Sequence, residues 1–124
     1  MPVRVLVVED SRTQALRLQL LLQKAGLSAE IAATGQEALA KATELEPDVI
    51  VLDINLPDID GFTVCQSLRK QPATADIPVI MLTVKDQAAD TLAGLDAGAD
   101  AYIPKDDFAQ TNLLQALRDM RLIP

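Results

Sequence analysis

The stretch Val3-Arg4-Val5-Leu6-Val7-Val8-Glu9-Asp10 is a nearly continuous apolar run that ends in two acidic residues. A short β-branched run of this kind is typical of a strand in a parallel sheet whose two faces are both covered. Two further runs, Val49–Leu52 and Val79–Leu82, have the same character. We therefore expect three central strands, the first of which leads into Glu9 and the second directly into Asp53.

Two shorter and less apolar segments, Ala29–Ala33 and Ala101–Ile103, are expected to be strands at the edges of the sheet. Between the strands, apolar residues recur at helical spacing and predict five helices. Their stripes are Leu18, Leu21, Leu22 and Ala25; Ala38, Ala42 and Leu45; Phe62, Cys65 and Leu68; Ala88, Leu92 and Leu95; and Leu113, Leu117 and Met120. This alternation predicts an α/β fold, a doubly wound five-stranded parallel sheet of order 2-1-3-4-5 with five flanking helices, which is the flavodoxin-like arrangement.

Composition and charge limit the classes of function. Of the 124 residues, 49% are apolar and 23% charged, so we expect residues 1–124 to form one globular domain. A formal net charge of -7 would repel nucleic acid and anionic membranes, so direct binding to either is not expected. The single Cys65 and an N-terminus unlike a signal peptide indicate the cytoplasm. The absence of histidine excludes histidine-dependent hydrolase triads and the common zinc sites.

Acidic residues follow two of the predicted central strands. In sheets of this order, ligands bind at the carboxyl ends of the strands, where the strand order reverses, so Glu9, Asp10 and Asp53 should converge there. Two like charges about 4 Å apart cost on the order of 4 kcal/mol at an effective dielectric constant near 20, which favours a divalent cation. Oxygen ligands and a phosphate donor favour Mg²⁺. The alternative is that Asp10 caps the first helix with Ser11, while Glu9 and Asp53 are solvated loop acids.

Thr83 and Lys105 follow the last two predicted strands, so they should lie on the same rim as the acids. A hydroxyl and an ammonium group can stabilise the charge on the equatorial oxygens of a transferred phosphoryl group. Their presence beside three carboxylates indicates a phosphate site. Taken singly, Lys105 could equally be an exposed loop lysine, and Thr83 an ordinary strand residue.

The sequence resembles the receiver domain of bacterial two-component response regulators over essentially its whole length. Four segments carry the resemblance. They are Val5-Leu6-Val7-Val8-Glu9-Asp10, Leu52-Asp53-Ile54-Asn55-Leu56-Pro57-Asp58-Ile59-Asp60-Gly61, Met81-Leu82-Thr83 and Gly98-Ala99-Asp100-Ala101-Tyr102-Ile103-Pro104-Lys105. The resemblance implies a signalling module, not an enzyme in the usual sense, that assists its own phosphorylation and dephosphorylation. Its donor would be a sensor histidine kinase or a histidine phosphotransfer protein.

The resemblance also implies roles for the site residues. Asp53 would be the nucleophile that accepts the phosphoryl group, with Lys105 and Thr83 holding the phosphoryl oxygens. Mg²⁺ would be held by Asp10, by Asp53 and by the backbone carbonyl of Asn55. Glu9 would act on the metal largely through water.

The expected output is a change of surface. Phosphorylation would draw Thr83 inward and let Tyr102 rotate, although on spacing alone Tyr102 could be a plain edge-strand aromatic. The resemblance implies a recognition face formed by the fourth helix, fifth strand and fifth helix, here roughly Asp86–Ala97 and Tyr102–Arg121. Its partners would be a downstream protein target and, as an open alternative, a second copy in a homodimer linked to phosphorylation. Gly94 would ease movement of the fourth helix or permit its close packing.

Two positions depart from the family pattern. Lys105 is followed by Asp106 where the family usually has proline, so the Lys105-Asp106 bond is either trans with an altered loop or a cis non-proline bond. Val84 stands where the family usually has a smaller residue. We expect its bulk to narrow access to Asp53 and to slow reaction with small phosphodonors or water.

Three other functional classes are weighed against this interpretation. A flavodoxin-like electron carrier shares the fold, but Glu9 and Asp10 would repel the flavin phosphate. An aspartyl phosphatase would usually have a second aspartate where Asn55 stands. A receiver-like scaffold that is never phosphorylated would have no need of the five site positions. Since the chain ends at Pro124, soon after the last predicted helix, output is expected through protein contacts. The segment Ile103-Pro104-Lys105-Asp106-Asp107-Phe108 resembles receivers of chemotaxis-like motility systems, and a phosphorelay or phytochrome-linked role is the open alternative.

Overall fold

The computed structural model describes residues 2–83 and 97–124, with nine helices and strands inside those ranges. In chain order they are β1 (Arg4–Val8), α1 (Arg12–Lys24), β2 (Ser28–Ala32), α2 (Gly35–Leu45), β3 (Val49–Asp53), α3 (Gly61–Lys70), β4 (Val79–Thr83), β5 (Ala101–Pro104) and α5 (Ala109–Asp119). The fourth predicted helix lies outside the described residues except for Ala97. Val84 and Gly94, on which two further predictions depend, also lie outside them. Strands and helices alternate as the sequence predicts.

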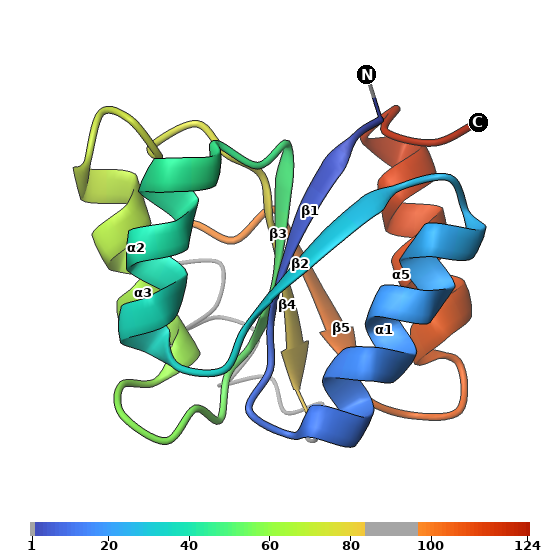
Figure 1. The fold of residues 1–124 in the computed structure, drawn as a ribbon, viewed down its shortest axis with the longest axis horizontal. Helices are drawn as coiled ribbons and strands as arrows, with labels where there is room; N and C mark the ends of the chain where they lie inside the picture. The colour runs from blue at the N-terminus through green and yellow to red at the C-terminus, as the bar shows by residue number, and fades with distance from the viewer. Residues whose placement is uncertain (1, 84–96) are drawn as a thin grey trace.

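The strands form one parallel sheet in the order β2-β1-β3-β4-β5, which confirms the predicted topology (Figure 1). The two weaker strands, β2 and β5, occupy the edges, as expected. In register, Val8 of β1 pairs with Leu52 of β3, and Asp53 pairs with Leu82 of β4. Because all the strands run in one direction, their carboxyl ends share one edge of the sheet.

Helices cover both faces of the sheet. α2 and α3 lie on one face, and α1 and α5 on the other (Figure 1). Alternate strand residues face the two layers, since successive side chains point to opposite sides of a strand. Leu6, Val8, Ile50 and Leu52 join the core with Ala38, Ala42, Val64, Cys65 and Leu68, whereas Val5, Val7, Val49 and Val51 join the core with Leu22, Leu113 and Leu117.

The observed strand ends differ from the predicted ones by a residue. Ala33 was expected to close β2, but its N–H donates to the Glu37 carboxylate at 3.3 Å and so does not extend the ladder. Thr83 and Asp53 belong to their strands instead of following them. The Lys105-Asp106 bond is trans, because the described residues contain no cis peptide bond. No helix within residues 2–83 and 97–124 is both long and apolar enough to cross a membrane.

Gly61 lets α3 begin directly against the end of β3. A Cβ atom built at Gly61 would lie 2.7 Å from the backbone oxygen of Asp53 and 2.8 Å from the Cα of Ile54. The Gly61 N–H donates to the Ile54 carbonyl at 2.8 Å, which fixes this close approach. Asp60 then caps the helix, since its carboxylate accepts the Thr63 N–H. Glycine at position 61 therefore shapes the backbone that carries Asp53.

We expect Gly61→Ala to lower the free energy of unfolding by about 1 to 3 kcal/mol, because the added methyl group meets backbone atoms that can give way only if the chain shifts. Chemical denaturation measures the change. Gln66→Ala, on the exposed side of α3, is the control and should stay within about 0.5 kcal/mol of wild type. Equal stability of the two variants would contradict the close packing at Gly61.

Candidate functional site

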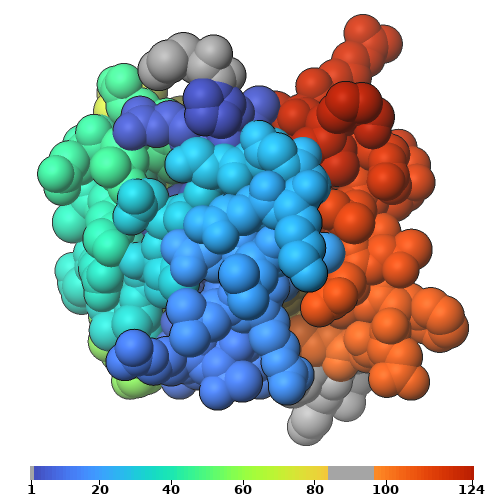
Figure 2. All heavy atoms as spheres, turned by 45° about the vertical axis from the view of Figure 1, so that its right-hand side comes forward, coloured from blue at the N-terminus to red at the C-terminus, as the bar shows by residue number. Residues whose placement is uncertain are grey.

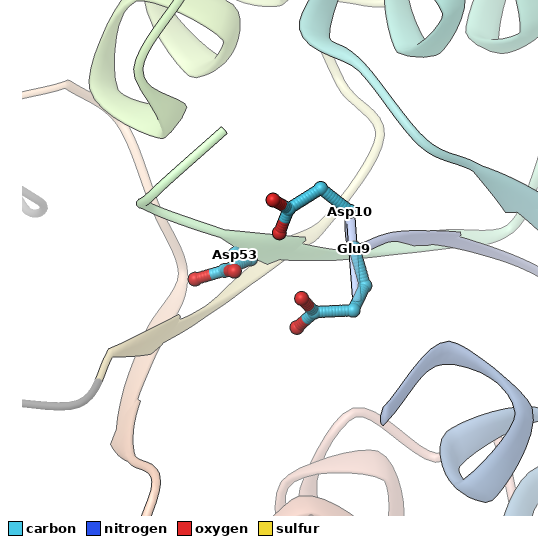
Figure 3. Close-up of side chains that lie close together, drawn as sticks. All are labelled: Glu9, Asp10 and Asp53. Carbon is cyan, nitrogen blue, oxygen red and sulfur yellow. The ribbon is translucent and has the colours of Figure 1, made fainter. Parts of the chain in front are cut away.

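Three carboxylates meet at the carboxyl edge of the sheet. Glu9 and Asp10 directly follow β1, Asp53 is the last residue of β3, and one oxygen of each lies within 4.8 Å of the others (Figure 3). Only 2% of Glu9 and 4% of Asp53 is exposed, whereas Asp10 is exposed. Glu9 and Asp53 are therefore not solvated loop acids. Such a group of oxygen ligands could hold a hard divalent cation.

Lys105 provides positive charge beside this cluster. It follows β5 at the edge of the sheet, and its side chain reaches back past β4. Its Nζ lies 2.7 Å from Glu9 Oε2 and 3.2 Å from Asp53 Oδ2, and it donates to Gln14 Oε1 at 3.0 Å. Only 16% of the Lys105 side chain is exposed. Solvent ions therefore screen its attraction to the two acids less than they would screen that of a surface lysine.

Both oxygens of the Glu9 carboxylate have partners in the protein. Oε1 accepts the Ser11 N–H at 3.1 Å, and Oε2 accepts from Lys105. Burial raises the pKa of Glu9 above its ordinary value, although the hydrogen bond from Lys105 acts in the opposite direction. Ser11 is the N-cap of α1, since its hydroxyl accepts the Gln14 N–H. Asp10 is thus not the cap, and its exposed carboxylate stands at the open side of the cluster.

Asp53 is held between two donors. Its Oδ1 accepts the backbone N–H of Asn55 at 3.2 Å, and its Oδ2 pairs with Lys105. Thr83, the last residue of the neighbouring strand β4, is buried, and its backbone carbonyl accepts the Lys105 N–H. The side chain of Asn55 is exposed. The five predicted positions and Asn55 therefore lie along one edge of the sheet.

Tyr102 lies in β5, directly across from Met81 of β4. Its side chain is half-buried and packs against the core layer under α2 and α3. Its hydroxyl oxygen is buried. The predicted switch residue thus stands on the strand next to the one that ends at Thr83, two positions before Pro104.

The loop between β3 and α3 is fastened to α2 by Asp58. Its Oδ1 accepts the Gly35 N–H at 2.8 Å, and its Oδ2 accepts the Gln36 N–H at 2.9 Å. These N–H groups belong to the first turn of α2, where backbone N–H groups have no acceptor within the helix. The two hydrogen bonds lower the pKa of Asp58, the bond from Gln36 being the stronger cause. The loop that follows Asp53 is therefore fixed at its far end.

Sequence reasoning missed the roles of Gln14 and Asp58. The pattern Ser11-Arg12-Thr13-Gln14 matches a helix capping box, which was a readable signal for Gln14 near the helix start. Its contact with Lys105 joins residues 91 positions apart, and Asp58 and Gly35 are 23 positions apart. No local sequence pattern predicts either contact.

Comparison with known proteins gives a consistent result. The family model "Response regulator receiver domain" matches residues 5–118. The chain is 44% identical over 118 residues to response regulator MprA of Mycolicibacterium vanbaalenii, an alignment that covers 95% of this chain and 50% of that protein. It thus spans about half the length of the curated relatives it matches.

Solved structures agree with the sequence comparison. A putative response regulator from Chloroflexus aurantiacus superposes with a TM-score of 0.90 at 36% identity, covering 97% of this chain and 98% of that one. The chemotaxis response regulator CheY4 of Vibrio cholerae superposes with a TM-score of 0.88 at 34% identity, covering 99% of this chain and 100% of that one.

Asp58→Asn should be less stable than wild type at neutral pH, because the amide offers one acceptor oxygen where the carboxylate offers two. Since the pKa of Asp58 is lowered in the folded state, its stabilising effect is complete above the unfolded value of 3.8 and disappears as the pH falls through the lower folded value. Denaturation across a pH series should therefore show a lower free energy of unfolding for Asp58→Asn than for wild type at pH 7. This difference should disappear at a pH below the folded pKa of Asp58. Asp76→Asn, on an exposed loop, is the control. A difference that persists unchanged in acid would contradict this role of the charge.

Proposed function

Because this chain belongs to the response regulator receiver domain family, we propose that it is a two-component signalling module in which Asp53 accepts a phosphoryl group. The donor is a sensor histidine kinase or a histidine phosphotransfer protein. The acidic cluster binds Mg²⁺ for this transfer. Receiver domains are signalling modules and not enzymes in the usual sense, and this chain would assist its own phosphorylation and dephosphorylation.

The observation that carries the proposal is the buried Asp53 carboxylate beside the Lys105 ammonium. Burying a carboxylate at 4% exposure and a second one, Glu9, at 2% costs free energy unless both are paired. One lysine is shared between them, and exposed Asp10 completes the cluster. A scaffold that is never phosphorylated gains nothing from this arrangement, so we do not favour that alternative.

The chemistry asked of these residues is mainly positioning. A carboxylate oxygen of Asp53 forms the new P–O bond while the P–N bond to the donor imidazole breaks, and the imidazole takes up a proton as it leaves. The Asn55 N–H on Oδ1 and Lys105 on Oδ2 restrain the rotation of the carboxylate. Lys105 can then contact the phosphoryl oxygens, and Thr83, buried at the end of the neighbouring strand β4, would supply a hydroxyl.

Mg²⁺ fits the donor set of the cluster, which consists of oxygen atoms alone. We propose that Asp10, Asp53 and the Asn55 carbonyl hold it, with Glu9 acting through water. When bound, the ion would neutralise charge on the carboxylates and on the phosphoryl oxygens. Exposed Asp10 would offer its carboxylate to the ion, whereas both oxygens of Glu9 already accept hydrogen bonds from Ser11 and Lys105.

The proposed output is a change at β5 and α5. Phosphorylation would draw Thr83 toward Asp53 and allow Tyr102 to move, since the two residues lie on adjacent paired strands. The altered surface would bind a downstream protein or, as an alternative, a second copy of the chain. We place this signalling in the cytoplasm, in keeping with the buried free thiol of Cys65. The net charge of -7 disfavours direct contact with nucleic acid.

Incubation of the wild-type protein with acetyl phosphate and Mg²⁺ should add one phosphoryl group, seen in the intact mass. Asp53→Ala should add none, because the accepting oxygen is gone. Asp76→Ala, at an exposed acid outside the cluster, is the matched control and should react as the wild type does. An adduct on Asp53→Ala of the same yield as on wild type would refute Asp53 as the acceptor.

Mg²⁺ should stabilise the folded chain, because the cluster exists only there. At an ion concentration one hundred times Kd, the free energy of unfolding should rise by about 2.7 kcal/mol. Asp10→Asn should reduce that rise, since it removes a charged ligand, whereas Asp76→Asn should retain it. Thermal denaturation with and without Mg²⁺ measures both. An undiminished rise in Asp10→Asn would exclude Asp10 from the metal site.

A further inference from the structure

Gln14 joins helix α1 to the site without belonging to the acidic cluster. Its Oε1 accepts a hydrogen bond from Lys105 Nζ at 3.0 Å. The two side chains line a groove of about 350 Å³ together with Arg17, Leu82, Asp106 and Gln110, among others. Figure 2 shows residues of α1 and α5 side by side on this face of the molecule. Gln14 thus connects α1 to Lys105, in the segment after β5.

The reason Gln14 is available for Lys105 lies in the start of α1. Ser11 is the N-cap and Gln14 the third helical residue, the spacing of a capping box. In that motif the glutamine side chain turns back to accept the N–H of the capping residue. Here the Ser11 N–H is already taken by Glu9 Oε1 at 3.1 Å. The amide oxygen of Gln14 is left to accept from Lys105.

Glu9 and Gln14 therefore act together on one ammonium group. A lysine ammonium has three N–H donors, and Lys105 has an oxygen of Glu9, of Asp53 and of Gln14 within 3.2 Å. Glu9 and Asp53 supply charge, whereas Gln14 supplies a neutral acceptor. A neutral acceptor fixes the direction of the third N–H without adding negative charge beside the place where a phosphoryl group would arrive.

From this geometry we propose that Gln14 is a positioning residue that holds the Lys105 ammonium at Asp53. The consequence for phosphorylation rests on the proposed function, because only then does Lys105 meet phosphoryl oxygens. Lysine has a flexible four-carbon stem, so losing one of its three acceptors widens the range of positions that the ammonium samples. Fewer molecules would then have Lys105 in place when the donor approaches.

The test compares the same substitution at two glutamines of α1. Gln14→Met keeps the length and helix propensity of the side chain but removes the acceptor oxygen. Gln19→Met is the matched control, since the Gln19 side chain donates to the Ala29 carbonyl of β2 at 2.9 Å. With acetyl phosphate and saturating Mg²⁺, we expect the maximum phosphorylation rate of Gln14→Met to fall by about threefold to tenfold, the effect of losing one typical hydrogen bond. Gln19→Met should stay within about twofold of wild type.

A second readout does not depend on phosphorylation. Acetylation of Lys105 by an amine-reactive reagent, scored by peptide mass spectrometry against exposed Lys24 in the same molecule, should be faster in Gln14→Met than in wild type. Gln14→Glu, which keeps an acceptor oxygen, should protect Lys105 at least as well as wild type does. A general loosening of α1 would not produce this rescue, and Gln19→Met should leave the labelling of Lys105 unchanged.

The outcomes separate the two proposals. Unchanged labelling of Lys105 in Gln14→Met would overturn the positioning role, as would an unchanged rate in a protein whose wild type is phosphorylated. A wild type that takes no phosphoryl group at Asp53 would instead defeat the proposed function. The labelling of Lys105 would still decide the assignment of Gln14 in that case.

Discussion

Three carboxylates repel one another at one edge of the parallel sheet, and the contacts of the surrounding groups depend on how this repulsion is offset. Glu9, Asp10 and Asp53 come within 4.8 Å of one another, and two of the three are buried. Lys105, which follows the edge strand β5, offsets part of this repulsion. The remaining negative charge leaves the cluster suited to a divalent cation, which would offset the repulsion among the carboxylates.

The backbone around Asp53 is fixed from several directions. Gly61 brings the start of α3 against the end of β3, and Asp58 ties the far end of the intervening loop to α2. On the other face, Ser11 and Gln14 connect the start of α1 to Glu9 and Lys105. These contacts connect the surroundings of Asp53 to the starts of three helices, α1, α2 and α3. The proposed phosphorylation would therefore change the charge beside groups that contact all three.

Much of the fold could be predicted from local sequence patterns, because central parallel strands and amphipathic helices have distinct periods. The run Val49–Leu52 and the stripe of Leu113 and Leu117 are examples of this, and the predicted strand order is confirmed. The strand ends were less predictable. Ala33 leaves the ladder because a side chain, Glu37, takes its N–H.

The candidate site was predictable as a set of strand ends, since parallel strands bring their carboxyl ends to one edge. Its pairing was not. That Lys105 is shared by Glu9, Asp53 and Gln14 follows from the reach of a side chain across the sheet, which no spacing in the sequence encodes. The two hydrogen bonds from the first turn of α2 to Asp58 are likewise not encoded by any spacing in the sequence.

The proposed function requires that Asp53 form an acyl phosphate. Borohydride reduction converts an aspartyl phosphate to homoserine, so peptide sequencing of the reduced phosphoprotein locates the modified residue directly. Homoserine at position 53, formed only when Mg²⁺ and the donor are both present, is the expected result. Homoserine at another aspartate, or none in a protein that carries the phosphoryl mass, would contradict the claim.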